Sequence, residues 1–304
     1  MKEIHPKVGL SRLCELFGKT RQAYYETTWR EEESLIEEVI LIEAVLKIRK
    51  LLPRVGGIKL LNMIQVVITE HRIKIGRDAF FELLANYNLL IKPKKRYVIT
   101  TNSYHIFHKW SNLIEDFSPT APEQLWVSDI TYLETLEGFI YLFLITDAYS
   151  KMIMGFHLSQ GLAARGCLIA LDKAVNQRQY KSTRLIHHSD RGIQYCCNQY
   201  VEALQENKIS ISMTQNGSPY ENAIAERING ILKTEFNLNR KFTNYYEAIE
   251  PVSSSIYAYN QIRPHFSIGL LTPEVAHQTE GLSLKKWKSK KWEVRTDHET
   301  KVDL

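Results

Sequence analysis

The sequence of 304 residues has no apolar run long enough to cross a membrane. Its longest apolar stretch, Phe139 to Ile145, is far shorter than the roughly 18 or more residues that a spanning helix needs. The first residues, Met1 to His5, also lack the apolar segment of a signal peptide. These absences predict a cytoplasmic protein with no membrane partner.

Cysteine is also scarce, with four residues in the whole chain. They show neither a C-x-x-C spacing nor the density of a disulfide-stapled domain. We therefore interpret them as buried thiols. The four are Cys14, Cys167, Cys196 and Cys197.

What the sequence does contain fits an enzyme of two or three domains, with 44% hydrophobic and 24% charged residues. The net charge of +5 is unevenly distributed. Residues 1–103 carry 18 Lys and Arg against 12 Asp and Glu, residues 104–235 carry 11 against 14, and residues 236–304 carry 10 against 8. Basic flanks suit contact with nucleic acid phosphates, and an acidic middle suits a cation site. Ordinary solvated charges are the alternative interpretation.

The N-terminus predicts a helix-turn-helix. Apolar residues recur at helical spacing from Val8 to Phe17, residues 18–20 form a turn, and a second helix follows from Arg21 to Tyr25. In that arrangement Lys19, Arg21 and Gln22 could reach phosphates or base edges of double-stranded DNA. A plain helical hairpin packed on the rest of the chain is the alternative.

Three further helices are expected over Ser34–Lys50, Ile58–Val67 and Ile75–Leu84. A basic linker with Lys94, Lys95 and Arg96 follows and could track a phosphate backbone, with a merely solubilising linker as the alternative.

From Gln124 the pattern changes to strands, expected over residues 126–133, 139–145, 152–157, 184–189 and 209–213. Helices are expected between them over residues 162–178 and 197–207. Three antiparallel-looking strands followed by alternating helices and strands match a ribonuclease H-like core. This is an α/β fold with a mixed five-stranded sheet and flanking helices, preceded here by helix-turn-helix modules.

Three carboxylates stand out in this region. Asp129 and Asp190 each follow or interrupt a short apolar run, whereas Glu226 lies in a pattern of helical period. Carboxylate oxygens are the ligands that magnesium prefers, and two such ions can clamp the attacking and leaving oxygens of a phosphodiester. The three acids therefore predict metal-dependent phosphoryl transfer on nucleic acid, with two Mg2+ ions that Mn2+ could replace.

These residues carry a resemblance to bacterial insertion-sequence transposases of the DDE class, which resemble retroviral integrases. The matching motifs are Trp126-x-x-Asp129-x-Thr131-Tyr132, His188-Ser-Asp190-Arg-Gly192-x-Gln194-Tyr195, Glu226-Arg-x-Asn229-Gly-x-Leu-Lys233 and Tyr259-Asn260-x-x-Arg263-Pro264-His265. The resemblance spans roughly residues 35 to 275. It implies Asp129, Asp190 and Glu226 as catalytic metal ligands, Lys233 as a DNA contact, and a second helix-turn-helix before the core in which Lys74 and Arg77 contact DNA.

The helix that carries Glu226 is expected to begin at Ser218, with Pro219 at its first position and Glu221 completing a capping box. Its apolar residues at spacings of three and four should face the core, which would leave a polar stripe on the opposite side. The stripe contains Asn222, Glu226, Asn229 and Lys233, and Arg227 flanks it. We expect these residues to face substrate.

Two neighbouring polar residues have open assignments. His188 shares the face of Asp190 and could orient substrate or serve a structural role. Asp147 follows a strand, and we interpret it as a turn residue that satisfies local backbone groups.

The sequence thus predicts a transposase that cleaves DNA at the ends of a mobile element and joins them to a target. The domains expected are an N-terminal helix-turn-helix (1–32), a second helical DNA-binding domain (33–91), a basic linker (92–120), the catalytic core (121–275) and a basic tail (276–304). The resemblance implies a homo-oligomer on DNA, and an upstream-frame DNA-binding partner protein is possible. A metal-dependent nuclease without joining and a DNA-binding repressor derived from a transposase are the alternatives.

Overall fold

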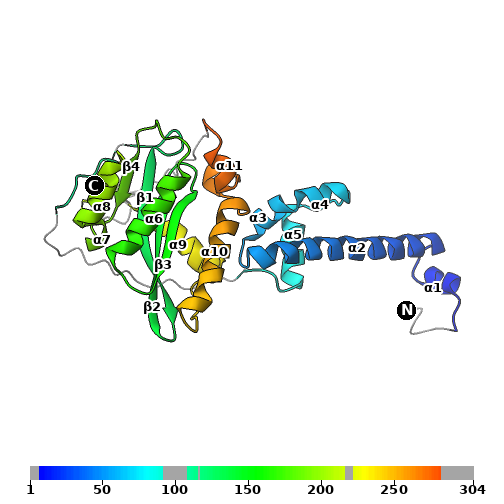
Figure 1. The fold of residues 1–304 in the computed structure, drawn as a ribbon. Helices are drawn as coiled ribbons and strands as arrows, with labels where there is room; N and C mark the ends of the chain where they lie inside the picture. Colours follow the sequence, from blue (N-terminus) through cyan, green and yellow to red (C-terminus); the bar gives the residue numbers. More distant parts are fainter. Residues whose placement is uncertain (1–6, 92–107, 116, 216–221, 282–304) are drawn as a thin grey trace, which may run out of the picture.

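The computed structural model describes residues 7–91, 108–115, 117–215 and 222–281 (Figure 1). The basic linker with Lys94, Lys95 and Arg96, the capping box at residues 218–221 and the Lys- and Trp-rich tail lie outside the described residues.

A mixed five-stranded sheet forms the centre of the chain, as predicted. Its strands are β1 (Leu125–Thr135), β2 (Gly138–Asp147), β3 (Ile153–Ser159), β4 (Ile186–Ser189) and β5 (Ser210–Met213). They lie in the order β3-β2-β1-β4-β5. The first three pair antiparallel, while β4 pairs parallel with both β1 and β5. The long strand β1 is therefore central, and β4 borders only its first part.

Helices cover both faces of this sheet. One face carries α6 (Ala164–Gln177), α7 (Ile193–Cys196) and α8 (Asn198–Glu206), and the other carries α9 (Ala223–Glu235) and α10 (Tyr245–Gln261). The contact between β3 and α6 is tight, because a Cβ at Gly155 would overlap the carbonyl oxygen of Ala170. The resulting layers of helix, sheet and helix confirm the ribonuclease H-like α/β fold.

The N-terminal region is helical and extends away from the sheet (Figure 1). Its helices are α1 (Leu10–Leu16), α2 (Arg21–Leu51), α3 (Gly57–Met63), α4 (Gln65–Glu70) and α5 (Arg77–Asn86). The two separate helices expected within residues 21–50 are in fact one helix of 31 residues. Thr20 caps its start by accepting from the backbone of Ala23, and no Gly or Pro interrupts it before Pro53. The predicted boundary between residues 32 and 33 therefore falls inside a continuous helix.

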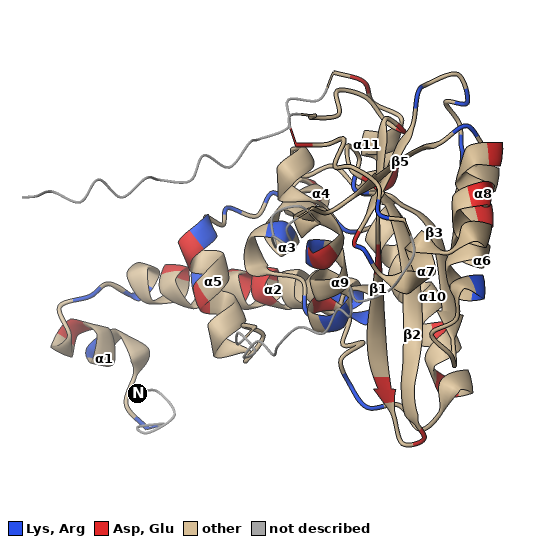
Figure 2. Ribbon diagram, turned by 90° about the vertical axis from the view of Figure 1, so that its left-hand side faces the viewer, with Lys and Arg blue, Asp and Glu red and all other residues tan. Residues whose placement is uncertain are grey.

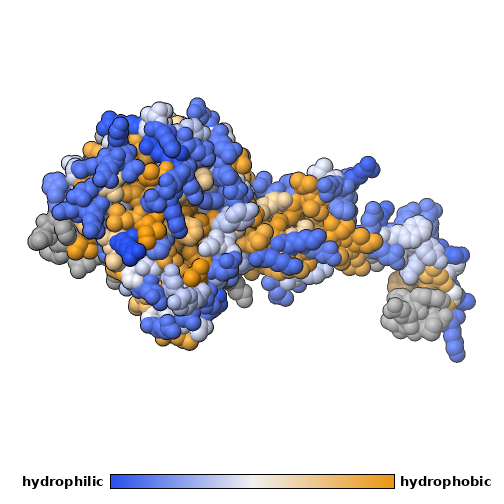
Figure 3. All heavy atoms as spheres, in the orientation of Figure 1, coloured by the Kyte–Doolittle hydropathy of each residue, from blue (hydrophilic) through white to orange (hydrophobic). Residues whose placement is uncertain are grey.

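The helical region joins the α9 and α10 side of the sheet through a shared core that includes Leu41, Phe80, Ile228 and Val252. Apolar residues also remain on the surface of α2, with Ile36 62% and Val39 53% exposed. Figure 3 shows orange, apolar positions over this part of the molecule. Among the described residues, no helix is long and apolar enough to span a membrane.

Candidate active site

Adjacent strands bring Asp129 and Asp190 to the same level of the sheet. In the parallel pair of β1 and β4, Val127 lies opposite His188. Asp129 and Asp190 each follow two residues later, so both project toward the side covered by α9. Asp190 comes immediately after β4 ends, and its Oδ1 accepts a hydrogen bond from the backbone of Gly192 at 2.9 Å.

The carboxylate of Asp129 accepts two hydrogen bonds and has two acidic residues near it. Its Oδ2 accepts from Asn229 Nδ2 at 2.6 Å, and its Oδ1 accepts from the backbone of Ile130 at 2.9 Å. Burial, followed by the carboxylate of Asp190, raises the pKa of Asp129 to about 7, and Glu226 adds a smaller effect of the same sign. The two hydrogen bonds act in the opposite direction because they stabilise the charged form. Asp129 is thus a carboxylate in an acidic setting that a cation would stabilise.

The polar stripe of α9 does not face away from the core as expected. Asn222 and Asn229 are both buried, and Asn222 Nδ2 donates to the carbonyl oxygen of Ser128 at 3.0 Å. The pairing of β1 with β4 ends at Val127, so beyond this point the edge of β1 is open to side chains of α9. Asn222 binds the backbone of that edge, whereas Asn229 binds the side chain of Asp129. The helical period of α9 alone could not reveal either contact.

Glu226 lies between these two amides along α9 and is itself exposed. Burial raises the pKa of its carboxyl. Within the described residues, no three or more His, Cys, Asp or Glu side chains stand close enough to form a ready metal cluster. Asp190 and Glu226 each come within electrostatic reach of Asp129, and the oxygen-only donor set of the three acids fits a hard divalent cation. Glu226 lies on the exposed surface of α9.

Other predicted contacts near the acids differ in exposure. Arg227 is exposed, and Lys233 is half-buried with its ammonium 4.3 Å from the ring centre of Tyr132. His188 is fully buried, and its Nδ1 lies 2.8 Å from the hydroxyl of Ser212 on β5. Of the two roles that the sequence left open for His188, the structure favours the structural one, because a fully buried ring cannot touch DNA in this arrangement.

The predicted contacts of the helical region are all on the surface. Lys19 lies in the turn before α2, and Arg21 and Gln22 lie in the first turn of α2. Lys74 and Arg77 are exposed near the start of α5, where Arg77 pairs with Asp78 at 2.8 Å. All five side chains are far enough from the core to meet a ligand, and their roles stay predictions.

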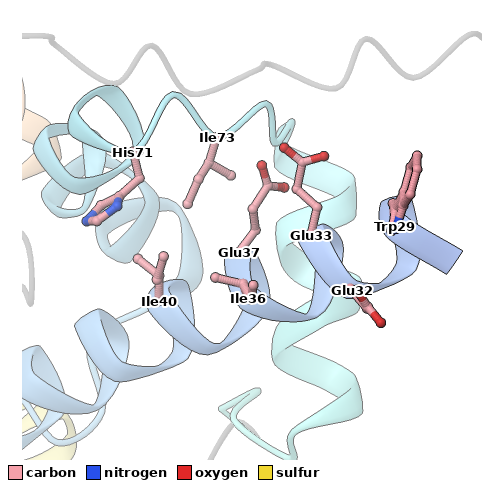
Figure 4. A pocket seen from close by; sticks show the side chains of 8 residues that line it. All are labelled: Trp29, Glu32, Glu33, Ile36, Glu37, Ile40, His71 and Ile73. Carbon is pink, nitrogen blue, oxygen red and sulfur yellow. The ribbon is translucent and has the colours of Figure 1, made fainter. Parts of the chain in front are cut away.

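A pocket in the helical region contains none of the predicted site residues. It opens between α2 and the segment before α5, and Figure 4 shows the side chains around it. Its lining consists of Trp29, Glu32, Glu33, Ile36, Glu37, Ile40, His71 and Ile73. Three glutamates would repel phosphate groups, so this pocket is unsuited to DNA.

Comparison with known proteins identifies the family of the chain. Residues 119–219 and residues 207–273 match two families that are each described as an integrase core domain. The chain is 33% identical over 268 residues to an uncharacterized 31 kDa protein of insertion element IS600 from Shigella sonnei, covering 86% of this chain and 96% of the relative. It is 30% identical over 206 residues to the transposase for insertion sequence element IS629 from Shigella sonnei, covering 68% of this chain and 69% of the relative.

The chain belongs to the insertion-sequence transposases with an integrase core domain. Among solved structures, it is similar to the HTLV-2 integrase catalytic core domain in complex with magnesium, with 16% identity and a TM-score of 0.40. That match covers 52% of this chain and 97% of the integrase chain.

In this transposase the motif from Tyr259 to His265 is structural, a role that the sequence did not reveal. Asn260 exchanges two hydrogen bonds with the backbone of Ile153 at the start of β3, at 2.9 and 3.0 Å. Arg263 donates to both carboxylate oxygens of Glu235, at 2.7 and 2.8 Å, and Lys59 completes the cluster at 3.5 Å. These contacts connect α10 to the sheet and to α9. Figure 2 shows basic and acidic positions around α3 and α9, where Lys59 and Glu235 lie.

Two smaller predictions are confirmed. Asp147 has the expected turn role, since its Oδ1 accepts from the backbone and hydroxyl of Ser150 at 2.7 and 2.8 Å. Of the four cysteines, all free, Cys197 is partly buried and the other three are buried.

Proposed function

We propose that this transposase cleaves DNA at the ends of an insertion sequence and joins them to target DNA with Asp129, Asp190 and Glu226 as its catalytic acids. The observation that supports this assignment is the setting of Asp129. Its carboxylate is fixed by Asn229, and the charges of Asp190 and Glu226 raise its pKa together with burial. Acids placed so that they disfavour one another's charge are typical of a site that receives a cation.

The three carboxylates would hold two divalent ions, with magnesium as the proposed metal and manganese as a substitute. When bound, these ions would stabilise negative charge on the oxygens of the phosphodiester. Asp129, whose carboxyl feels the charge of both other acids, would be one of the ligands that hold the metal. Asn229 fixes the orientation of Asp129, a task that partners of metal ligands commonly perform.

The chain's own residues then hold the DNA. Arg227 and Lys233, on α9 beside the acids, supply positive charge near the reacting phosphate. The exposed Lys19, Arg21, Gln22, Lys74 and Arg77 would bind more distant DNA through phosphates or base edges. We propose that helices α1 to α5 form this DNA-binding part, and that the basic linker with Lys94, Lys95 and Arg96 continues the path.

Both ends of an element must be held together during joining, so we propose assembly as a homo-oligomer on DNA. An upstream-frame partner protein would supply further DNA binding. All three proposed acids lie on this chain, so the chemistry can first be tested with this chain alone.

The decisive experiment is magnesium-dependent cleavage and joining of labelled duplexes taken from DNA flanking the gene. The unmodified protein is compared with Glu226→Gln and with a matched control, Glu202→Gln, which makes the same change on the exposed surface of α8. Joined products from the unmodified protein and the control, absent with Glu226→Gln, are the expected result. Cleavage without joining in the unmodified protein would indicate a nuclease, and binding without either reaction would indicate a repressor.

A further inference from the structure

An exposed aromatic pair stands near the turn that joins β1 to β2. The rings of Tyr132 and Phe139 have centroids 5.1 Å apart and lie nearly perpendicular, at 75°. Tyr132 is 39% exposed and Phe139 is 54% exposed. In the antiparallel register Tyr132 pairs with Tyr141 and Glu134 with Phe139, so the two rings occupy the same face of the sheet.

Within the part of the chain that the structure describes, both rings remain exposed at that end of the sheet. The pairing of β2 with β3 reaches no further than Tyr141, and Phe139 lies beyond it. Large exposed aromatic side chains are unfavourable in water, so a pair of them suggests a ligand with a flat, apolar surface. Tyr132 lies three residues after Asp129 on β1, on the opposite face of the sheet.

Lys233 links this pair to the acids. Its ammonium lies 4.3 Å from the centre of the Tyr132 ring, within the range of a cation–π contact. The charges of Asp129 and Glu134 act on the same ammonium and raise its pKa, while burial has a larger, lowering effect. A cation is thus placed between an aromatic surface and the proposed catalytic carboxylate.

We propose that Tyr132 and Phe139 form a stacking site for an unpaired base of the DNA end, with Lys233 on the adjoining phosphate. An aromatic ring beside a cation matches the two parts of a nucleotide, the flat base and the charged phosphate. A base inside a duplex has no free face, so the site takes a nucleotide that has left the helix. Glu134 on the same face disfavours a run of phosphates, which limits the site to a single nucleotide. The proposal rests on the proposed function, because it places the DNA end at Asp129.

The test uses the full chain and flanking-DNA duplexes that carry 2-aminopurine at successive terminal positions. This base is fluorescent when unstacked and is quenched on an aromatic ring. Binding is measured in calcium, so that no reaction consumes the duplex. The variants are Phe139→Ala, the conservative Phe139→Trp, and the control Tyr257→Ala, which removes a 63% exposed aromatic ring from α10.

With 2-aminopurine in a mismatched and therefore already unstacked end, the expected result is a position-specific quenching on binding that Phe139→Ala removes and Phe139→Trp restores, with Tyr257→Ala unchanged. Phe139→Ala should also weaken binding of the end duplex roughly tenfold, within the range of one base–aromatic stack. A duplex whose terminal bases are mismatched, and so already unpaired, should bind the unmodified protein more tightly than the matched duplex.

Two outcomes would overturn the stacking site: identical fluorescence changes with the unmodified protein and Phe139→Ala, or equal binding of matched and mismatched ends. Joining by the unmodified protein is followed on the same duplexes in magnesium. If joining occurs while the fluorescence is insensitive to Phe139, the stacking site is rejected and the proposed function stands. If no cleavage or joining occurs, the proposed function itself fails. Thermal unfolding of each variant verifies that the exposed substitution leaves the fold intact.

Discussion

The raised pKa of Asp129 makes a prediction about stability that can be measured without DNA. Its ordinary value is 3.8, and burial with the neighbouring acids raises the pKa to about 7. A raised pKa means that the folded protein favours the neutral carboxyl, so this stabilisation is complete below about pH 4 and is lost as pH rises through 7. Each pH unit between the two pKa values costs about 1.36 kcal/mol, so the unfavourable contribution of Asp129 to folding grows by roughly 2–3 kcal/mol between pH 5 and pH 8.

Asp129→Asn removes this contribution, so the variant should gain stability over the unmodified protein as pH rises. Asparagine has one acceptor oxygen in place of two, so one of the donors Asn229 and Ile130 loses its acceptor, at about 1 kcal/mol with little dependence on pH. The difference in free energy of unfolding between the two proteins should therefore change by about 2–3 kcal/mol from pH 5 to pH 8, whatever its absolute value.

Urea unfolding followed by circular dichroism at pH 5, 6, 7 and 8, without divalent ions, measures this slope. Asp172→Asn on the exposed surface of α6 is the matched control and should show no such slope. Magnesium at pH 8 should stabilise the unmodified protein but not Asp129→Asn, because the cation needs the carboxylate. A difference between Asp129→Asn and the unmodified protein that is flat from pH 5 to 8 would refute the reasoning.

Three further substitutions test the contacts around the site. Asn229→Ala removes a hydrogen bond that lowers the pKa of Asp129, so the magnesium concentration for half-maximal joining at pH 7 should rise about tenfold; an unchanged titration contradicts this role. Arg263→Met leaves Glu235 without its two strongest donors and should lower the free energy of unfolding by about 3–5 kcal/mol in calorimetry. Replacing both partners by apolar residues should recover much of that loss, and a double variant as unstable as the single one would count against the pairing. Gly155→Ala forces a Cβ into the backbone of α6 and should destabilise by roughly 1–3 kcal/mol in the same assay, whereas a neutral result would mean that β3 and α6 can separate easily.

The sheet could be predicted from the sequence because its strands have strong apolar patterns. The run from Phe139 to Ile145 predicted β2, which extends over Gly138–Asp147, and the other strands differ by a few residues at most. The helices were harder to predict. α10 was not assigned, and its internal Pro251 is a residue that usually ends a helix. The sequence predicted two helices in place of the continuous α2, because the helix has no regular apolar face.

Candidate acids could be named from residue type and spacing, but their surroundings could not. The burial of Asn222 and Asn229 depends on where the pairing of β1 with β4 ends, which is a tertiary property. Helical period predicted that both amides face away from the core, and this was wrong because β1 provides polar partners for them, the carbonyl oxygen of Ser128 for Asn222 and the carboxylate of Asp129 for Asn229. The same limit applies to Phe139, whose exposure depends on the shortness of the pairing between β2 and β3.

Helix α9 connects the acid site to the N-terminal region. It carries Glu226 on its exposed surface, fixes Asp129 through Asn229, and ends in Glu235, which binds Lys59 of α3 and Arg263, just after α10. Burial lowers the pKa of Lys59 to about 8, so this ammonium keeps its charge near neutral pH largely through Glu235. A rigid helix transmits a displacement at one end to the other, because its backbone hydrogen bonds resist bending. Under the proposed function, movement of α3 when the helical region binds DNA would therefore act on Glu226, the third of the proposed catalytic acids.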